Sequence, residues 1–115
     1  NKMSIQNNNK IEELTFNGEV YVLTDVKTFS SAVHFSVMLS DNQLGTIIGE
    51  IPGNMPSSYG DIIYFQTPKT RLAFTVSYKY FLRPDITKTE LPLIPDIQID
   101  GNEALDEAIK IINNN

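Results

Sequence analysis

The sequence predicts an α/β fold, and three features of its 115 residues carry that prediction. Two short apolar runs flank a helix-like segment, two alternating segments follow, and an amphipathic segment lies near the end of the chain. A strand, a helix and a strand within about thirty residues form a βαβ unit, which requires parallel strands and a right-handed crossover. We therefore expect a βαβ unit, a β-hairpin and a C-terminal helix, in that order.

The βαβ unit begins after the turn at Asn17-Gly18. Glu19–Thr24 is a β-branched and aromatic run that predicts a buried strand. Ser30–Ser40 predicts a helix, and its apolar residues cover more than one face, so we expect it to be largely buried. These residues are Val33, Phe35, Val37, Met38 and Leu39. Gly45–Glu50 predicts the second strand.

The predicted hairpin follows a loop at Ile51–Gly60, which is rich in Gly, Pro and Ser and too irregular for a ladder. Asp61–Thr67 and Arg71–Tyr80 alternate around Pro68-Lys69-Thr70, a pattern typical of two paired strands. In this hairpin we expect side chains to alternate between core and surface. That expectation includes three aromatic residues, Tyr78, Tyr80 and Phe81.

The last third of the chain starts with a connection at Phe81–Pro95, which contains three prolines. Ile97–Ile99 predicts one more short strand. Asn102–Ile112 predicts an amphipathic helix that Asn102 caps. Its expected core stripe consists of Leu105, Ala108, Ile109 and Ile112.

Composition excludes several kinds of function. The chain has no cysteine and one histidine, His34, so a zinc site, a disulfide framework and thiol chemistry are excluded, and no cofactor is expected. Nine basic against 14 acidic residues give a formal charge of −5, which argues against nucleic acid as a partner. No apolar run approaches the ~20 residues that span a bilayer, and the first residues do not resemble a signal peptide. Residues 1–10 are expected to be a disordered or vector-derived polar segment.

The segment with the most chemical content is Thr28-Phe29-Ser30-Ser31-Ala32, between the first strand and the helix. A serine at the first turn of a helix lies beside unpaired N–H groups and the positive end of the helix dipole, which together can stabilise an oxyanion. The other interpretation is that Thr28, Ser30 or Ser31 simply caps the helix. From the pattern alone, capping is favoured.

Several motifs in order resemble the tail-specific, or C-terminal processing, serine proteases and their tricorn-core relatives. They are the Thr28–Ala32 motif, Ile48-Gly49-Glu50 at the end of a strand, and Pro95-Asp96-Ile97 before the last helix. The resemblance runs from about Glu19 to Ile112 and implies a crotonase-like (Clp-protease-like) core, of which residues 11–115 would be the C-terminal part. It also implies a polypeptide substrate and an extracytoplasmic or cell-envelope location.

The resemblance assigns roles to individual residues. Ser30 matches the nucleophile, and the N–H of Ser31 matches one oxyanion donor. The family's lysine base falls close to Met55, so this sequence departs from the family there, and a base must come from elsewhere. In the tricorn-like branch a late glutamate orients the base, and Glu90 lies in roughly that place, although a solvated carboxylate is the favoured interpretation. His34, four residues after Ser30, could reach it on a helix, but a packing role is favoured.

Three hypotheses remain open from the sequence. The first is that the chain is the nucleophile-bearing part of a serine endopeptidase that works through an acyl-enzyme, with the isolated 115 residues inactive. The second is a catalytically inactive family member that binds a peptide or another ligand. The third is an unrelated α/β interaction module. The Pro52–Gly60 loop is expected either to line the substrate site or to be an ordinary connection. Exposed apolar surface on such a fragment also predicts self-association.

Overall fold

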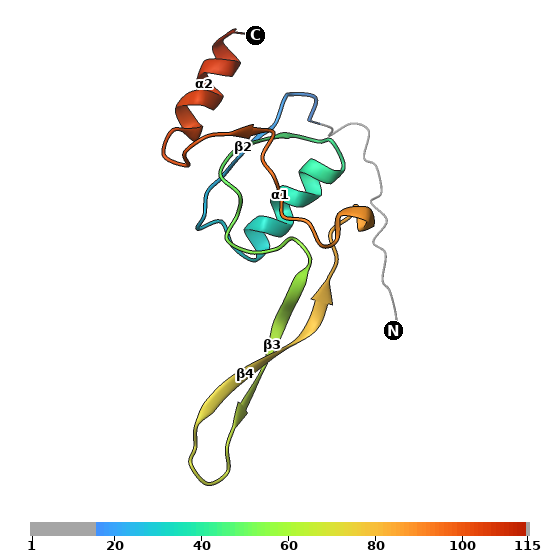
Figure 1. Ribbon diagram of the computed structural model, residues 1–115, viewed down its shortest axis with the longest axis vertical. Helices are drawn as coiled ribbons and strands as arrows, with labels where there is room; N and C mark the ends of the chain where they lie inside the picture. Colours follow the sequence, from blue (N-terminus) through green and yellow to red (C-terminus); the bar gives the residue numbers. More distant parts are fainter. Residues whose placement is uncertain (1–15, 115) are drawn as a thin grey trace.

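A three-stranded parallel sheet forms the centre of the molecule in the computed structural model, which describes residues 16–114 (Figure 1). The sheet has the order β1-β2-β5. Its strands are β1 (Tyr21–Thr24), β2 (Thr46–Gly49) and β5 (Ile97–Gln98). The polar segment predicted at residues 1–10 lies outside the described residues.

The predicted βαβ unit is confirmed. β1 and β2 pair in parallel from Tyr21 opposite Thr46 to Thr24 opposite Gly49, and α1 (Ser31–Asp41) connects them. β5 pairs in parallel with the other edge of β2. All three strands therefore end at the same edge of the sheet, where the loop leading to α1 begins.

Two small apolar cores lie on opposite faces of β2, because successive side chains of a strand point to opposite faces. Ile47 packs with Val37 of α1 and with Leu93. Ile48 packs with Ala104 and Ala108 of α2 (Ala104–Asn114). The sheet is thus covered by one helix on each side.

The expectation that α1 is largely buried is wrong. Val33, Ser36 and Val37 are buried, but Phe35 and Met38 are 58% and 56% exposed. The buried residues follow one stripe of the helix, because α1 contacts the sheet along one face only. The opposite stripe has no cover among the described residues.

The predicted C-terminal helix exists, but its predicted core stripe and cap are wrong. Of the four predicted core residues only Ala108 is buried, and Leu105, Ile109 and Ile112 are 56%, 46% and 53% exposed. Small side chains at Ala104 and Ala108 let the helix approach the sheet closely, so they face it in place of the larger residues. Asn102 lies before the helix, where its N–H and its side-chain amide both donate to Oδ1 of Asp100.

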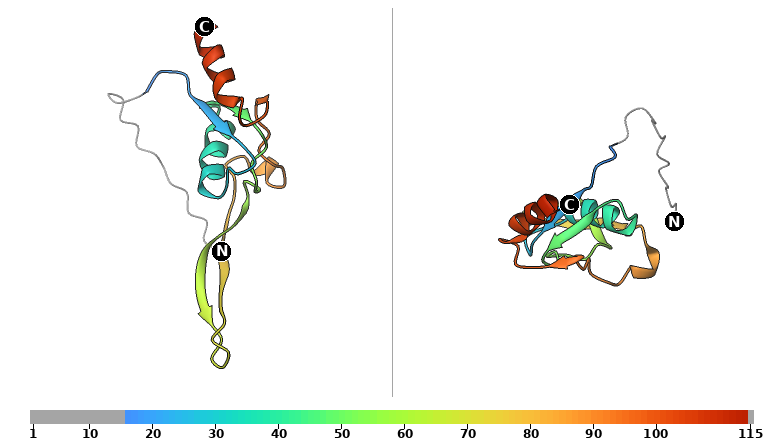
Figure 2. Two further views of the ribbon diagram at one scale, coloured as in Figure 1. Left: turned by 90° about the vertical axis from the view of Figure 1, so that its left-hand side faces the viewer. Right: turned by 90° about the horizontal axis from the view of Figure 1, so that it is seen from above.

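The predicted hairpin is confirmed as β3 (Ser58–Gln66) paired antiparallel with β4 (Ala73–Phe81). β3 begins inside the predicted irregular loop, since Ser58 to Gly60 already pair with β4. The hairpin projects away from the sheet as a long arm (Figures 1 and 2). Its side chains alternate between two faces, yet Tyr78 and Tyr80 remain exposed, because most of the arm has no core behind it.

The connection after the hairpin is fastened to α1 by a buried ion pair. Arg83 donates from Nε and Nη2 to the two carboxylate oxygens of Asp41, at 3.0 and 2.6 Å. Nη1 of Arg83 also donates to the carbonyl oxygen of Lys88, the last residue of the short 3₁₀ helix η2 (Ile86–Lys88), and to that of Leu91 just after it. The C-terminal end of α1 is therefore tied to residues 83–91. No helix in the described part of the chain is long and apolar enough to cross a bilayer.

Candidate active site

The loop between β1 and α1 is shaped by Asp25. Oδ1 of Asp25 accepts hydrogen bonds from the N–H groups of Lys27 and Thr28, both at 2.8 Å. The Thr28 hydroxyl in turn accepts the N–H of Asp25 at 2.9 Å. The Thr28 side chain is thus used inside the loop, and the interpretation of Thr28 as the helix cap is wrong.

Ser30 occupies the position just before α1 with an unusual backbone conformation. Its φ is 54° and its ψ is −118°, and its side chain makes no capping hydrogen bond. The capping interpretation of Ser30 is therefore wrong, and the residue is exposed to solvent. A positive φ at a non-glycine residue costs on the order of 1–3 kcal/mol and tends to occur at functional sites.

The strained backbone at Ser30 leads to a testable prediction about the free energy of unfolding. We expect Ser30→Gly to raise the free energy of unfolding by about 1 kcal/mol, because glycine adopts a positive φ without steric cost. Ser31→Gly, the same chemical change at the first residue of the helix, is expected to lower it by up to about 0.5 kcal/mol, because glycine loses more backbone freedom on folding. Urea unfolding of both variants measures the difference. A loss of stability in Ser30→Gly would show that the turn is not strained.

The segment after β2 holds the Ser30 turn in place. Oδ1 of Asn54 accepts the N–H of Ser30 at 2.7 Å, and Nδ2 of Asn54 donates to the carbonyl of Met55 at 2.9 Å. The N–H of Gly53 donates to the carbonyl of Thr28 at 3.1 Å. A Cβ at Gly53 would lie 2.3 Å from the carbonyl oxygen of Val26, so this close approach requires glycine.

Sequence reasoning missed Asp25 and Asn54 as organisers of the site. An aspartate directly after a strand is a common start for a side-chain-to-backbone turn, so Asp25 carried a readable signal. Asn54 carried none, because its partner lies 24 residues earlier in the chain.

The backbone N–H groups at the start of α1 differ in availability. The N–H of Ser30 is bound to Asn54, and the N–H of Ala32 donates to the carbonyl of Phe29 at 3.2 Å. Between them, the N–H of Ser31 has no acceptor within the described chain. It is one of the unpaired N–H groups of the helix N-terminus, where the helix dipole favours negative charge.

Of the other predicted site residues, neither His34 nor Glu90 hydrogen-bonds the Ser30 side chain, whereas Met55 directly follows Asn54, which binds the Ser30 N–H. The His34 ring packs against the Phe81 ring at a centroid distance of 5.2 Å, as expected for a packing histidine. Met55 lies beside Asn54 and is 38% exposed. Glu90 belongs to the segment that Arg83 ties to Asp41, at the end of α1 remote from Ser30. Eleven helical residues span about 16 Å, so the structure does not bring Glu90 to Ser30.

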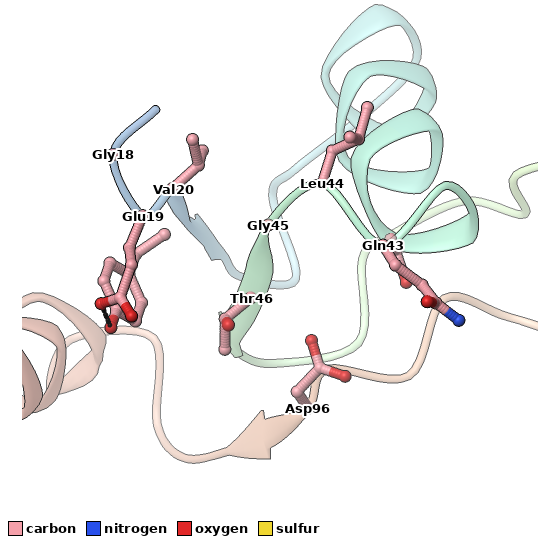
Figure 3. Close-up of a pocket in the computed structure, with 10 residues that line it drawn as sticks. Gly18, Glu19, Val20, Gln43, Leu44, Gly45, Thr46 and Asp96 are labelled. Carbon is pink, nitrogen blue, oxygen red and sulfur yellow. Dashed lines mark hydrogen bonds between the residues drawn. The ribbon is translucent and has the colours of Figure 1, made fainter. Parts of the chain in front are cut away.

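Two hollows lie at opposite edges of the sheet. A small crevice of about 170 Å³ at the carboxyl ends of the strands includes Asp25 and Thr28 of the Ser30 loop. The larger groove, about 590 Å³, opens at the amino ends, where Glu19 and Asp96 contribute carboxylates (Figure 3). Oδ2 of Asp96 accepts the N–H of Ile47 at 2.8 Å and thereby holds β2. Because Ser30 lies at the carboxyl edge, the smaller crevice is the one that adjoins the candidate site.

Comparisons with known proteins agree with the motifs in the sequence. No curated protein matched the chain. A family model described as Peptidase family S41 matches residues 1–99, which include the two paired strands, the Ser30 turn and the hairpin. The structure agrees with it in placing a serine between a parallel strand and the start of a helix. The match shows that the chain belongs to peptidase family S41, a family of serine peptidases.

Proposed function

We propose that this chain is the nucleophile-bearing part of a serine endopeptidase of the tail-specific type, and that Ser30 is its nucleophile. In this proposal, residues 11–115 form the C-terminal part of a crotonase-like catalytic core. The substrate is a polypeptide, and no metal or cofactor takes part. The family match supports peptidase chemistry, and the conformation of Ser30 supports the residue assignment.

The observation that carries the proposal is that Ser30, at the start of α1, has a strained backbone and does not cap the helix with its side chain. A serine that served the fold would be expected to cap the helix from an extended backbone. Ser30 instead has a positive φ, leaves its hydroxyl out of the capping position and is held through its N–H by Asn54. A sharp strand-to-helix turn that exposes a serine hydroxyl is the geometry that peptidases and esterases use for nucleophiles.

The chemistry follows from that geometry. Oγ of Ser30 forms a bond to the carbonyl carbon of the scissile peptide, and its proton passes to a base. The carbonyl oxygen becomes negatively charged, and the free N–H of Ser31 is placed to stabilise it. The C–N bond then breaks, the amine leaves with a proton, and water hydrolyses the acyl-enzyme.

This mechanism needs a base, and we infer that neither His34 nor position 55 supplies it. His34 packs against Phe81, and position 55, close to where the family carries its lysine, is methionine. We therefore expect the isolated 115-residue chain to lack peptidase activity, while the full-length parent protein supplies the base.

The test is labelling of the full-length parent with a fluorophosphonate, which reacts with activated serines. We expect the wild type and Ser31→Ala to be labelled and Ser30→Ala to be unlabelled. Ser31→Ala is the matched control, because it removes the neighbouring hydroxyl but keeps the backbone N–H. If the folded wild-type parent is unlabelled, Ser30 is not an activated nucleophile, and the inactive ligand-binding alternative is favoured.

A further inference from the structure

The arm formed by β3 and β4 has one apolar face that nothing in the described part of the chain covers. Ile63 pairs with Val76 and Phe65 with Phe74, so these side chains lie on the same face. Tyr78 follows on that face by alternation. We call these five residues the arm face; they are 44% to 57% exposed. The rings of Phe65 and Phe74 stack at a centroid distance of 5.4 Å.

The arm is also positively charged within an acidic chain. Residues 62–78 contain Lys69 and Arg71 and no acidic residue, a formal charge of +2. The whole chain has a formal charge of −5. Apolar area and positive charge therefore coincide on a segment that projects from the body (Figure 1).

A complementary surface lies on α2. Leu105, Ile109 and Ile112 have the spacing that places them on one helix face, and all three are about half exposed. Asp106 neighbours Ile109 on the helix surface at spacing i, i+3. Residues 100–114 contain four carboxylates and one lysine, a formal charge of −3. We call Leu105, Ile109 and Ile112, with the acidic residues beside them, the helix stripe.

The arm face and the helix stripe cannot meet within one molecule, because the arm and α2 extend from opposite ends of the body (Figure 1). We propose that they bind each other between two copies of this chain, arm face on helix stripe, twice in a two-fold dimer. A two-fold arrangement satisfies both contacts at once and closes the assembly. Direct pairing of two arms is disfavoured, because both carry a charge of +2.

Charge reversal tests this pairing in the 115-residue chain by sedimentation velocity. The wild type is expected to form a dimer that weakens as salt rises. An arm variant, Lys69→Glu with Arg71→Glu, and a helix variant, Glu103→Lys with Asp106→Lys, should each dimerise at least about tenfold more weakly. An equimolar mixture of the two should recover a dimer, because each reversed arm then meets a reversed helix.

Controls separate this proposal from its alternatives. Lys27→Glu, an exposed charge reversal outside both surfaces, should leave the dimer unchanged. Ile112→Lys serves as a second helix variant, because a cation near the last turn suits the helix dipole, and it should also weaken the dimer. Circular dichroism verifies the fold of each variant. A wild type that stays monomeric and binds vesicles of anionic lipid overturns the proposal in favour of a membrane surface. A helix variant that dimerises like the wild type overturns it in favour of arm-to-arm contact.

Discussion

Asp41→Asn is expected to lower the free energy of unfolding by about 3–5 kcal/mol, the largest stability effect of any single change to a charged residue here. The side chains of Asp41 and Arg83 are 1% and 3% exposed. Loss of the carboxylate charge leaves the guanidinium of Arg83 buried without a counter-ion. Asp41 also accepts the N–H of Asp85, so the variant loosens the connection that carries η2.

The same pair predicts an acid-sensitive stability. Burial alone would raise the pKa of Asp41, but the hydrogen bonds from Arg83 and from the N–H of Asp85 hold it below its usual value. Because the folded-state pKa is lower than the unfolded one, the carboxylate stabilises the fold above about pH 4. This contribution is lost as the pH falls through the folded-state pKa. Urea unfolding of the wild type between neutral and acid pH should show the loss, and Asp41→Asn should reduce it.

Asp61→Asn is the matched control for this prediction. Asp61 binds Lys79 at 2.6 Å, but both side chains are about half exposed, and exposed pairs contribute only about 0–1 kcal/mol. If Asp41→Asn costs no more than Asp61→Asn, the buried pair does not stabilise the fold as inferred.

Gly49→Ala is expected to lower the free energy of unfolding by about 3 kcal/mol or more, because the added Cβ clashes with the backbone of the neighbouring strand and the positive φ strains any residue but glycine. Gly49 has a φ of 130°, and a Cβ at this position would lie 2.0 Å from the carbonyl oxygen of Thr24. That carbonyl accepts the N–H of Glu50, directly before the loop that leads to Ser30. The variant should therefore disturb the carboxyl edge of the sheet as well as its stability.

Gly45→Ala, directly before the same strand, is the control. A Cβ there meets the Val20 carbonyl at 3.0 Å, a contact that small shifts relieve, so a cost of about 1 kcal/mol is expected. Thermal and urea unfolding of both variants measure the contrast. Equal costs would mean that the positive φ and the close approach at Gly49 are unimportant.

The sequence predicted the elements whose signal is local. The apolar runs around Tyr21–Thr24 and Thr46–Gly49 and the alternation on both sides of Pro68 identify strands without reference to the rest of the chain. It failed where burial depends on a partner. In α2 the large side chains make the predicted stripe, yet Ala104 and Ala108 face the sheet, because close packing favours small residues there.

The features of the candidate site also separate into those with a local sequence signal and those that depend on a distant partner. The position of Ser30 at a strand-to-helix turn was predictable from the flanking motifs. Its positive φ and its missing cap were not, because the turn is held by Asn54 and Gly53, which follow β2 in the chain and lie beside Ser30 in the fold, where β2 pairs with β1. Side-chain contacts across 24 residues leave no periodic pattern in a single sequence.

The hydrogen bond from Ser30 to Asn54 also bears on how the protein is made. During synthesis Ser30 leaves the ribosome before Asn54, because chains grow from their N-terminus. A nascent chain that ends before residue 54 has the serine but lacks the acceptor that holds its turn. The Ser30–Asn54 hydrogen bond can therefore form only once β2 and the segment after it have emerged, so the turn before α1 is completed late in the synthesis of this part of the chain.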